Sequence, residues 1–139
     1  MTTIRHLEGG RAACAYEYAL AANQLDSSIA KAYKSYVKKI PMLIKTNGLG
    51  ATFAFVLSKS NENPKKKDYA YTLIHQQTWD WLQQGHKRYL LDNKKGADLP
   101  SVLIQLHSAN YRAVTVEVLS LFSWLRRFAE GLIEGEAEE

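Results

Sequence analysis

Side chains with catalytic potential are few and scattered in this sequence. It contains one cysteine, Cys14, and four histidines, His6, His75, His86 and His107. No two histidines are four residues apart, the spacing that places two metal ligands on one helical face. A single cysteine also excludes a cysteine-based metal site and an internal disulfide. We therefore expect no metal and no cofactor, and we expect His75 to be a structural residue with a hydrogen-bond partner.

The carboxylates and glycines suggest no active site either. Glu117 and Glu130 belong to one predicted helix, where 13 residues correspond to about 20 Å along the axis. The Gly48-Leu49-Gly50 segment is too short for a dinucleotide-binding fingerprint and follows no predicted strand. We therefore expect a protein that is not an enzyme. A small metal-independent nuclease is the catalytic alternative, and it would require a histidine or carboxylate cluster in a cleft.

The basic side chains are more ordered than the catalytic types. At 100° per residue, four lysines form a narrow stripe along residues 27–45, opposite a face that carries Tyr33, Val37 and Ile40. The four are Lys31, Lys34, Lys38 and Lys45. A phosphate chain along this stripe would relieve the repulsion between like charges and release counterions. The stripe predicts four exposed lysines that bind RNA, although a merely solvated lysine face has the same pattern.

The distribution of charge supports an anionic partner. The 139-residue chain has a net charge of +4, but its tail, residues 134–139, holds four of the 14 acidic residues. Residues 1–133 therefore carry 18 basic and 10 acidic side chains, a net charge of +8. We expect residues 1–133 to form a single helical domain, followed by an acidic C-terminal tail over residues 134–139. Nucleic acid is the usual partner of a basic domain, although the lysines can also serve solubility alone.

Composition also indicates the cellular compartment. Residues 1–25 lack the apolar segment of a signal peptide. No run approaches the roughly 18 apolar residues of a membrane span. A lone cysteine fits a reducing cytosol. We therefore expect a cytoplasmic protein with no membrane partner.

Helices must position these side chains, because no segment shows sustained alternation of apolar and polar residues. Only three prolines and eight glycines occur, which favours long helices with short connections. We predict an all-α, compact helical bundle of about five to six helices. The expected helices span 7–24, 27–45, 49–59, 68–84 and 108–132, with a brief helix that starts at Leu99 or Ser101 and ends at 107. A short helix at 89–92 is a further candidate. Pro41 should kink the second helix near Val37. The predicted core includes Ile40, Phe55, Trp81, Leu121 and Leu125.

Two tryptophans and two arginines lie off the predicted apolar stripes. Trp79 points away from the core face of residues 68–84, so we expect it at a protein interface, unless a loop covers it. Trp124 lies beside the apolar stripe of residues 108–132, which makes that helix apolar over much of its circumference and predicts a second interface position. Arg112 and Arg127 lie on its other side, where they are available to RNA phosphate or to a carboxylate.

Two segments resemble a known family. The first is KKIPMLI at residues 38–44, followed by NGLG at 47–50 and AF at 54–55. The second is YRAVTVE at residues 111–117, followed by WLRRFAEG at 124–131. In this order and spacing they are similar to the small-subunit family of the Cmr complex, the type III-B CRISPR effector. The resemblance covers most of the chain from about residue 30 to 133.

The resemblance implies a structural function. Small subunits of this family are helical bundles without catalytic residues, and several copies stack beside the backbone subunits that hold the guide RNA. They help to form the groove in which guide RNA and target RNA pair. Target cleavage belongs to the backbone subunits and nucleotide cyclisation to the large subunit. The expected partners are therefore backbone and large Cmr subunits, further copies of the chain, and both RNAs. The main alternative is a protein–protein adaptor without RNA contact.

Overall fold

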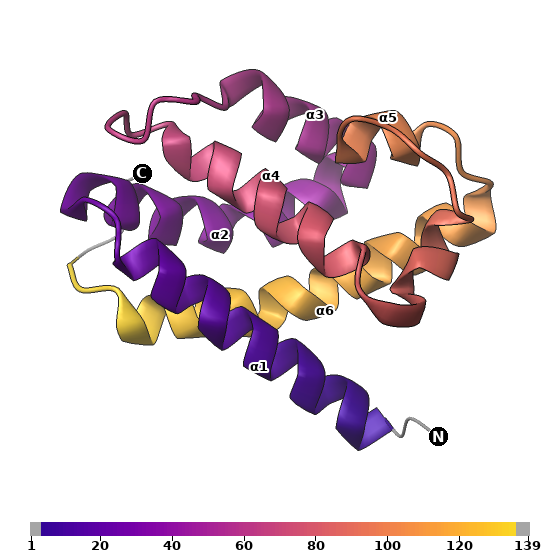
Figure 1. Cartoon of the computed structure of the whole chain (residues 1–139), viewed down its shortest axis with the longest axis horizontal. Coiled ribbons are helices and arrows are strands. Elements are labelled where there is room, and N and C mark those ends of the chain that lie inside the picture. The colour runs from indigo at the N-terminus through magenta and orange to yellow at the C-terminus, as the bar shows by residue number, and fades with distance from the viewer. Residues whose placement is uncertain (1–3, 136–139) are drawn as a thin grey trace.

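The computed structural model of the chain describes residues 4–135, which are helical with short connections and contain no strand. The predicted all-α, compact bundle is confirmed (Figure 1). The helices are α1 (Ile4–Asn23), α2 (Ser27–Asn47), α3 (Leu49–Lys59), α4 (Tyr69–Leu82), a 3-10 helix η1 (Gly85–Leu91), α5 (Leu99–Leu103) and α6 (Ser108–Leu132).

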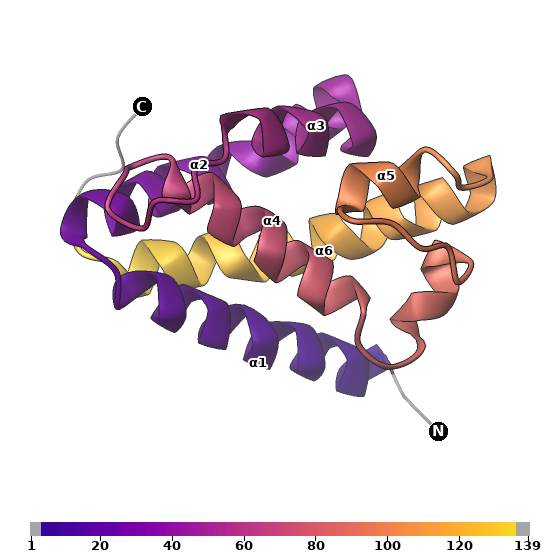
Figure 2. The ribbon, with the colours of Figure 1, turned by 45° about the horizontal axis from the view of Figure 1, so that its top comes forward.

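Helix α6 is the longest element and organises the bundle. It crosses the molecule and packs against α1, α2 and η1. Helix α4 packs against α2 and α3, while α1 and α3 lie at opposite edges of the bundle (Figure 2). The core contains buried apolar side chains from all of these helices, and α2 turns one face toward it.

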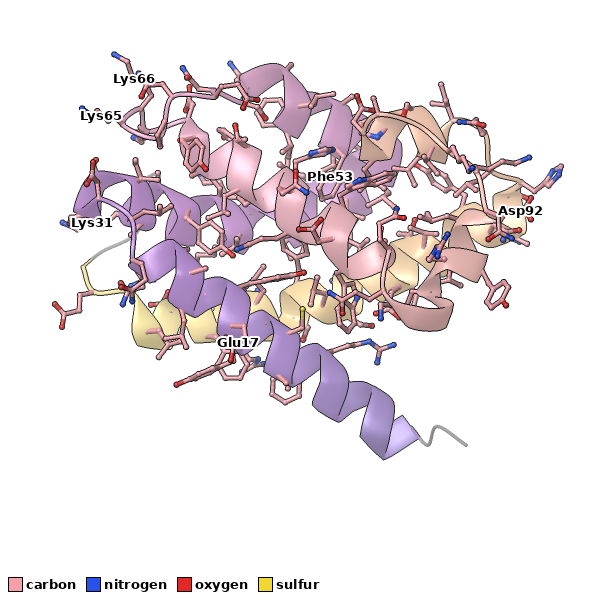
Figure 3. All side chains as sticks on the ribbon, in the orientation of Figure 1. Glu17, Lys31, Phe53, Lys65, Lys66 and Asp92 are labelled. Carbon is pink, nitrogen blue, oxygen red and sulfur yellow. The ribbon has the colours of Figure 1, made fainter. Side chains whose placement is uncertain are left out.

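The apolar periodicity explains which side chains are buried. Phe53 of α3 lies in the interior of the molecule (Figure 3), with its ring edge-on to Phe122 at 6.5 Å. The predicted core residues other than Phe55 are confirmed as buried; they are Ile40, Trp81, Leu121 and Leu125.

The prediction that Phe55 belongs to the core is wrong, because Phe55 is 40% exposed. Helix α3 buries Leu49, Phe53 and Val56 against its neighbours. Phe55 is two residues from Phe53, so it projects from almost the opposite side of the helix at 100° per residue. In so apolar a helix the sequence did not distinguish the buried face from the exposed one.

The turn between α2 and α3 packs against the start of α6. Gly48 has φ of 92° and lets α3 begin directly after α2, which runs through Pro41 without interruption. The backbone N–H of Gly50 donates to the Tyr111 hydroxyl at 2.7 Å. A Cβ atom at Gly50 would lie 3.2 Å from that hydroxyl oxygen. The NGLG segment and the start of the YRAVTVE segment therefore fit together.

Leu121 provides a test of the core. It is fully buried, so Leu121→Ala should lower the free energy of unfolding by about 2–5 kcal/mol, the range for large-to-small core substitutions. Ile104→Ala is the control, because Ile104 is 84% exposed and its loss should cost no more than about 0.5 kcal/mol. Urea denaturation of both variants measures the difference, and equal stabilities would contradict this packing.

Candidate nucleic-acid interface

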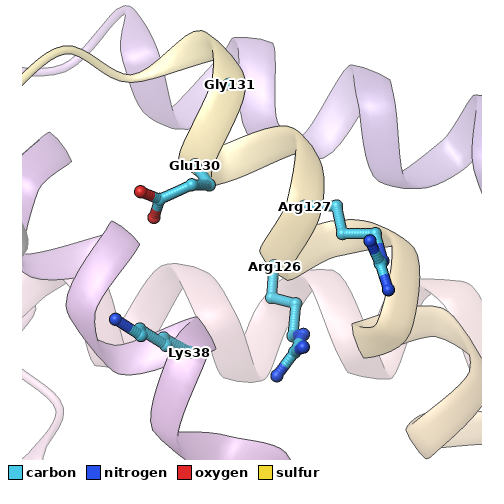
Figure 4. A pocket seen from close by; sticks show the side chains of 5 residues that line it. All are labelled: Lys38, Arg126, Arg127, Glu130 and Gly131. Atoms are coloured by element: carbon cyan, nitrogen blue, oxygen red, sulfur yellow. The ribbon is translucent and has the colours of Figure 1, made fainter.

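A basic groove lies between α2 and α6. It encloses about 430 Å³ and is lined by Lys38 of α2 and by Arg126, Arg127, Glu130 and Gly131 of α6 (Figure 4). All five residues are exposed. Three cations and one carboxylate give the lining a net charge of +2. Guanidinium and ammonium groups each bind anions such as phosphate, and here they point in different directions along the groove (Figure 4).

A second hollow follows along the same pair of helices. It encloses about 360 Å³ between Lys45 of α2 and a surface of α6 that includes Val116 and Trp124. Lys45 lies two turns beyond Lys38, and Trp124 lies just before the two arginines. We call the two hollows together the α2–α6 groove. Arg112 is exposed and, at 100° per residue, shares this face of α6.

The predicted lysine stripe divides into two parts in the structure. Lys38 and Lys45 are exposed in the α2–α6 groove. Lys34 is only 6% exposed, so the expectation that it meets solvent is wrong. Its Nζ donates to the carbonyl of Ile133 at 2.9 Å and to that of Gly135 at 2.7 Å. Periodicity placed Lys34 opposite the core, but the chain that follows α6 covers it.

Lys31 lies beside the same segment. It is half-buried, and a Cβ atom at Gly135, whose φ is 94°, would lie 2.6 Å from the Lys31 Cε. The chain just after α6 thus packs closely over the first part of the stripe. Of the acidic tail predicted over residues 134–139, only residues 134–135 belong to the described part, and residues 136–139 lie outside it.

Sequence reasoning missed a buried ion pair at Glu117. The Arg11 guanidinium donates from Nε to Oε2 at 2.9 Å and from Nη2 to Oε1 at 3.1 Å. The indole Nε1 of Trp81 also donates to Oε2, at 3.1 Å. Lys87 completes the cluster, with its Nζ 3.8 Å from the centre of the Trp81 ring. These contacts connect α1, α4, η1 and α6.

Hydrogen bonds keep this carboxylate ionised. Burial by itself raises the pKa of Glu117, but the hydrogen bonds from Arg11 and Trp81 and the charges of Arg11 and Lys87 outweigh it and lower the pKa. Both carboxylate oxygens accept from fixed donors. The arrangement therefore serves packing and not proton transfer. A carboxylate within an apolar helical stripe is the sequence signal that could have revealed it.

His75 has the structural role expected of it. Its Nε2 accepts a hydrogen bond from the backbone N–H of Leu99 at 3.1 Å. Burial lowers the pKa of His75, so the ring is neutral at pH 7. Among the side chains that the structure describes, in residues 10–84 and 87–135, no group of three or more histidine, cysteine, aspartate or glutamate residues could hold a metal ion. No helix within residues 4–135 is long and apolar enough to cross a membrane.

Both tryptophans expected at interfaces are partly buried. Trp79 is half-buried and lines a hollow together with Leu91, Lys94 and Lys95. Trp124 stacks on Phe128 with ring centres 5.9 Å apart and also borders the α2–α6 groove. Each indole keeps some exposed surface that a partner could cover.

Comparisons with known proteins agree with this architecture. Residues 7–132 match the family described as CRISPR-associated protein (Cas_Cmr5). The fold is similar to the crystal structure of a CRISPR-associated Cmr5 family protein from Thermus thermophilus, with a TM-score of 0.71 and 25% sequence identity. The match covers 96% of this chain and 100% of that one.

Proposed function

Because this chain belongs to the Cmr5 family of CRISPR-associated proteins, which makes it a subunit of a Cmr complex, we propose that it is a non-catalytic structural subunit that contacts RNA. It stacks beside the backbone subunits of a type III-B complex, next to further copies of itself. Its α2–α6 groove lines the path of the paired guide RNA and target RNA. The large subunit and the backbone subunits supply the chemistry.

One observation supports this proposal above the others: three exposed cations from two helices gather in a single groove. Lys45 and Arg112 extend the same basic face along α2 and α6. Phosphate contacts of this kind bind RNA without reading its sequence. Base pairing between guide and target supplies the specificity, so the subunit needs only a basic surface of suitable shape.

The dependence of RNA binding on salt tests this proposal in the isolated chain. We expect a labelled guide–target duplex to bind at low salt and the affinity to fall steeply as salt rises, because counterions are released from each neutralised phosphate. Fluorescence anisotropy at several salt concentrations gives the slope. Absence of binding at low salt would favour the adaptor without RNA contact.

A protein-interface role for the tryptophans is compatible with RNA binding and is tested separately. We expect Trp79 or Trp124 to lose accessible surface when the chain joins its neighbours, because each indole is only partly covered in the monomer. Acrylamide quenching of tryptophan fluorescence should therefore decrease on assembly. The Trp79→Phe and Trp124→Phe variants assign the change, since Trp81 is already buried. Unchanged quenching in an assembled complex would contradict this role.

A further inference from the structure

A second groove, lined by aromatic rings, lies on the other side of α2. It lies between α2, α3 and the start of α4, encloses about 230 Å³ and includes Tyr36, Phe55 and Tyr71 in its lining. The rings of Tyr36 and Tyr71 stack with centres 3.9 Å apart. Phe55 meets Tyr71 edge-on at 5.9 Å. A further hollow of about 310 Å³ shares Leu43 and Phe55 with it, and we call both together the aromatic groove.

The aromatic rings are held in place but not enclosed. The Tyr36 hydroxyl donates to Asp68 Oδ1 at 3.3 Å, and Asn61 and Thr72 bond to each other between the α3–α4 loop and α4. Burial raises the pKa of Tyr36 and of Tyr71, so both rings are uncharged at pH 7. Phe55 is 40% exposed. The chain therefore keeps a large apolar ring at its surface within a preformed aromatic site.

Lysines surround these rings. Lys39 lines the groove itself, and the Lys59 Nζ lies 5.9 Å from the centre of the Phe55 ring. The α3–α4 loop adds Lys65 and Lys66, which project from the edge of the molecule (Figure 3). With Lys67, Glu62 and Asp68 counted, the groove and loop carry a net charge of +3.

We propose that the aromatic groove binds an unpaired base of single-stranded RNA, packed against Phe55 and the Tyr36–Tyr71 pair, with its flanking phosphates near Lys39 and Lys59. Aromatic rings interleaved with basic residues are what sequence-tolerant single-strand binding requires, because every base has a flat apolar face. The excess positive charge of the groove disfavours a protein segment with few acidic residues as its occupant. The hollow lined by Tyr36, Phe55 and Tyr71, at about 230 Å³, is smaller than the roughly 300–1,000 Å³ of pockets for drug-sized ligands, and this size suits one flat ring.

The two grooves flank one exposed ridge of α2. Lys38 lines the α2–α6 groove and Lys39 lines the aromatic groove. A strand that leaves a duplex bound in the first groove can therefore cross α2 and place its first unpaired base in the second. This inference extends the proposed function and rests on it for the choice of RNA as partner, but the aromatic site uses none of the α2–α6 residues.

Substitutions at Phe55 test the site in the isolated full chain. The probe is a 12-nucleotide oligouridylate, with a blunt RNA duplex for comparison. Phe55→Leu keeps apolar bulk but removes the aromatic face, so affinity for the oligouridylate should fall about five-fold or more while affinity for the duplex stays the same. Phe55→Tyr keeps an aromatic face, so its affinity for the oligouridylate should match that of the parent. Leu57→Ala is the matched control, since Leu57 is a similarly exposed residue of α3, at 39%, and lines neither hollow of the aromatic groove.

Photocrosslinking supplies a second measurement that does not depend on folding of a variant. An oligouridylate with 4-thiouridine should crosslink to the segments around Phe55 or Tyr71, as mapped by mass spectrometry. Equal affinities of the parent and Phe55→Leu, crosslinks confined to the α2–α6 groove, or no oligouridylate binding at low salt would each overturn the inference. A Phe55→Leu variant that no longer assembles with its neighbours but binds the oligouridylate as the parent does would overturn the inference as well. If Phe55 matters for the single strand while duplex binding is absent, the aromatic site stands and the α2–α6 proposal fails.

Discussion

Replacing Glu117 with alanine should lower the free energy of unfolding by about 3–5 kcal/mol, as for other buried ion pairs that lose one partner. The Arg11 and Glu117 side chains are only 16% and 10% exposed. Removing the carboxylate leaves a guanidinium charge and the Trp81 indole N–H without the acceptor that both now use. Urea denaturation measures the loss.

Two variants keep this result interpretable. Glu130→Ala removes an exposed carboxylate from the same helix and should change stability by no more than about 0.5 kcal/mol. Glu117→Gln keeps the shape and one acceptor, so it should fall between the alanine variant and the parent. A Glu117→Ala variant as stable as the parent would mean that the Arg11–Glu117 contact contributes nothing to the fold.

The same carboxylate makes stability depend on pH. Its pKa is lowered in the folded chain, so its contribution is present above the ordinary glutamate pKa of about 4.3 and is lost as pH falls through the folded value. The stability difference between the parent and Glu117→Ala should therefore be largest near pH 7 and shrink in acid. A constant difference from neutral to acid pH would contradict this assignment.

The sequence predicted those elements whose apolar pattern is long and has clear ends. It placed the start of α6 at Ser108 and its end at Leu132, and it placed α3 between Leu49 and Lys59, as observed. These helices have one dominant apolar stripe or a glycine stop, which are local signals. The break around residues 60–67 is also observed, because its polar residues and proline cannot continue α3.

The errors share a physical cause. Periodicity gives the direction of a side chain about its own helix but does not say which neighbour lies there. Lys34 points away from the α2 core face, yet its ammonium group donates hydrogen bonds to the carbonyls of Ile133 and Gly135, which are 99 and 101 residues away in the sequence. Glu117 and Arg11 meet across 106 residues. Such contacts depend on the packing of α1, α2 and α6, and no local pattern contains them.

Lys34 also determines which residues can test the α2–α6 groove. Its ammonium group holds the chain after α6, so reversing its charge would damage the fold and confuse the result. Lys38, Lys45 and Arg127 are all exposed, and each lines the groove. They are therefore the residues whose charge can be changed with little effect on stability.

Reversing these three charges to glutamate should weaken duplex RNA binding by about ten-fold or more at low salt, where screening is least. Three attractive phosphate contacts are lost and three repulsive ones appear, so the dependence of affinity on salt should also become shallower. Guide-directed target cleavage in a reconstituted complex should fall with it, because in the proposed function the groove positions RNA for the active site of a neighbour.

The matched control separates groove charge from total charge. Arg88, Lys94 and Lys95 are exposed cations around the Trp79 hollow, outside the α2–α6 groove. Their reversal changes the net charge by the same amount, so it should weaken RNA binding by the isolated chain far less than reversal in the groove. Equal losses in the two variants would show that RNA senses only the overall charge of the domain. If the groove variant assembles normally and binds RNA as the parent does, the α2–α6 groove does not contact RNA. The aromatic groove and Arg112 then remain as the candidate contacts.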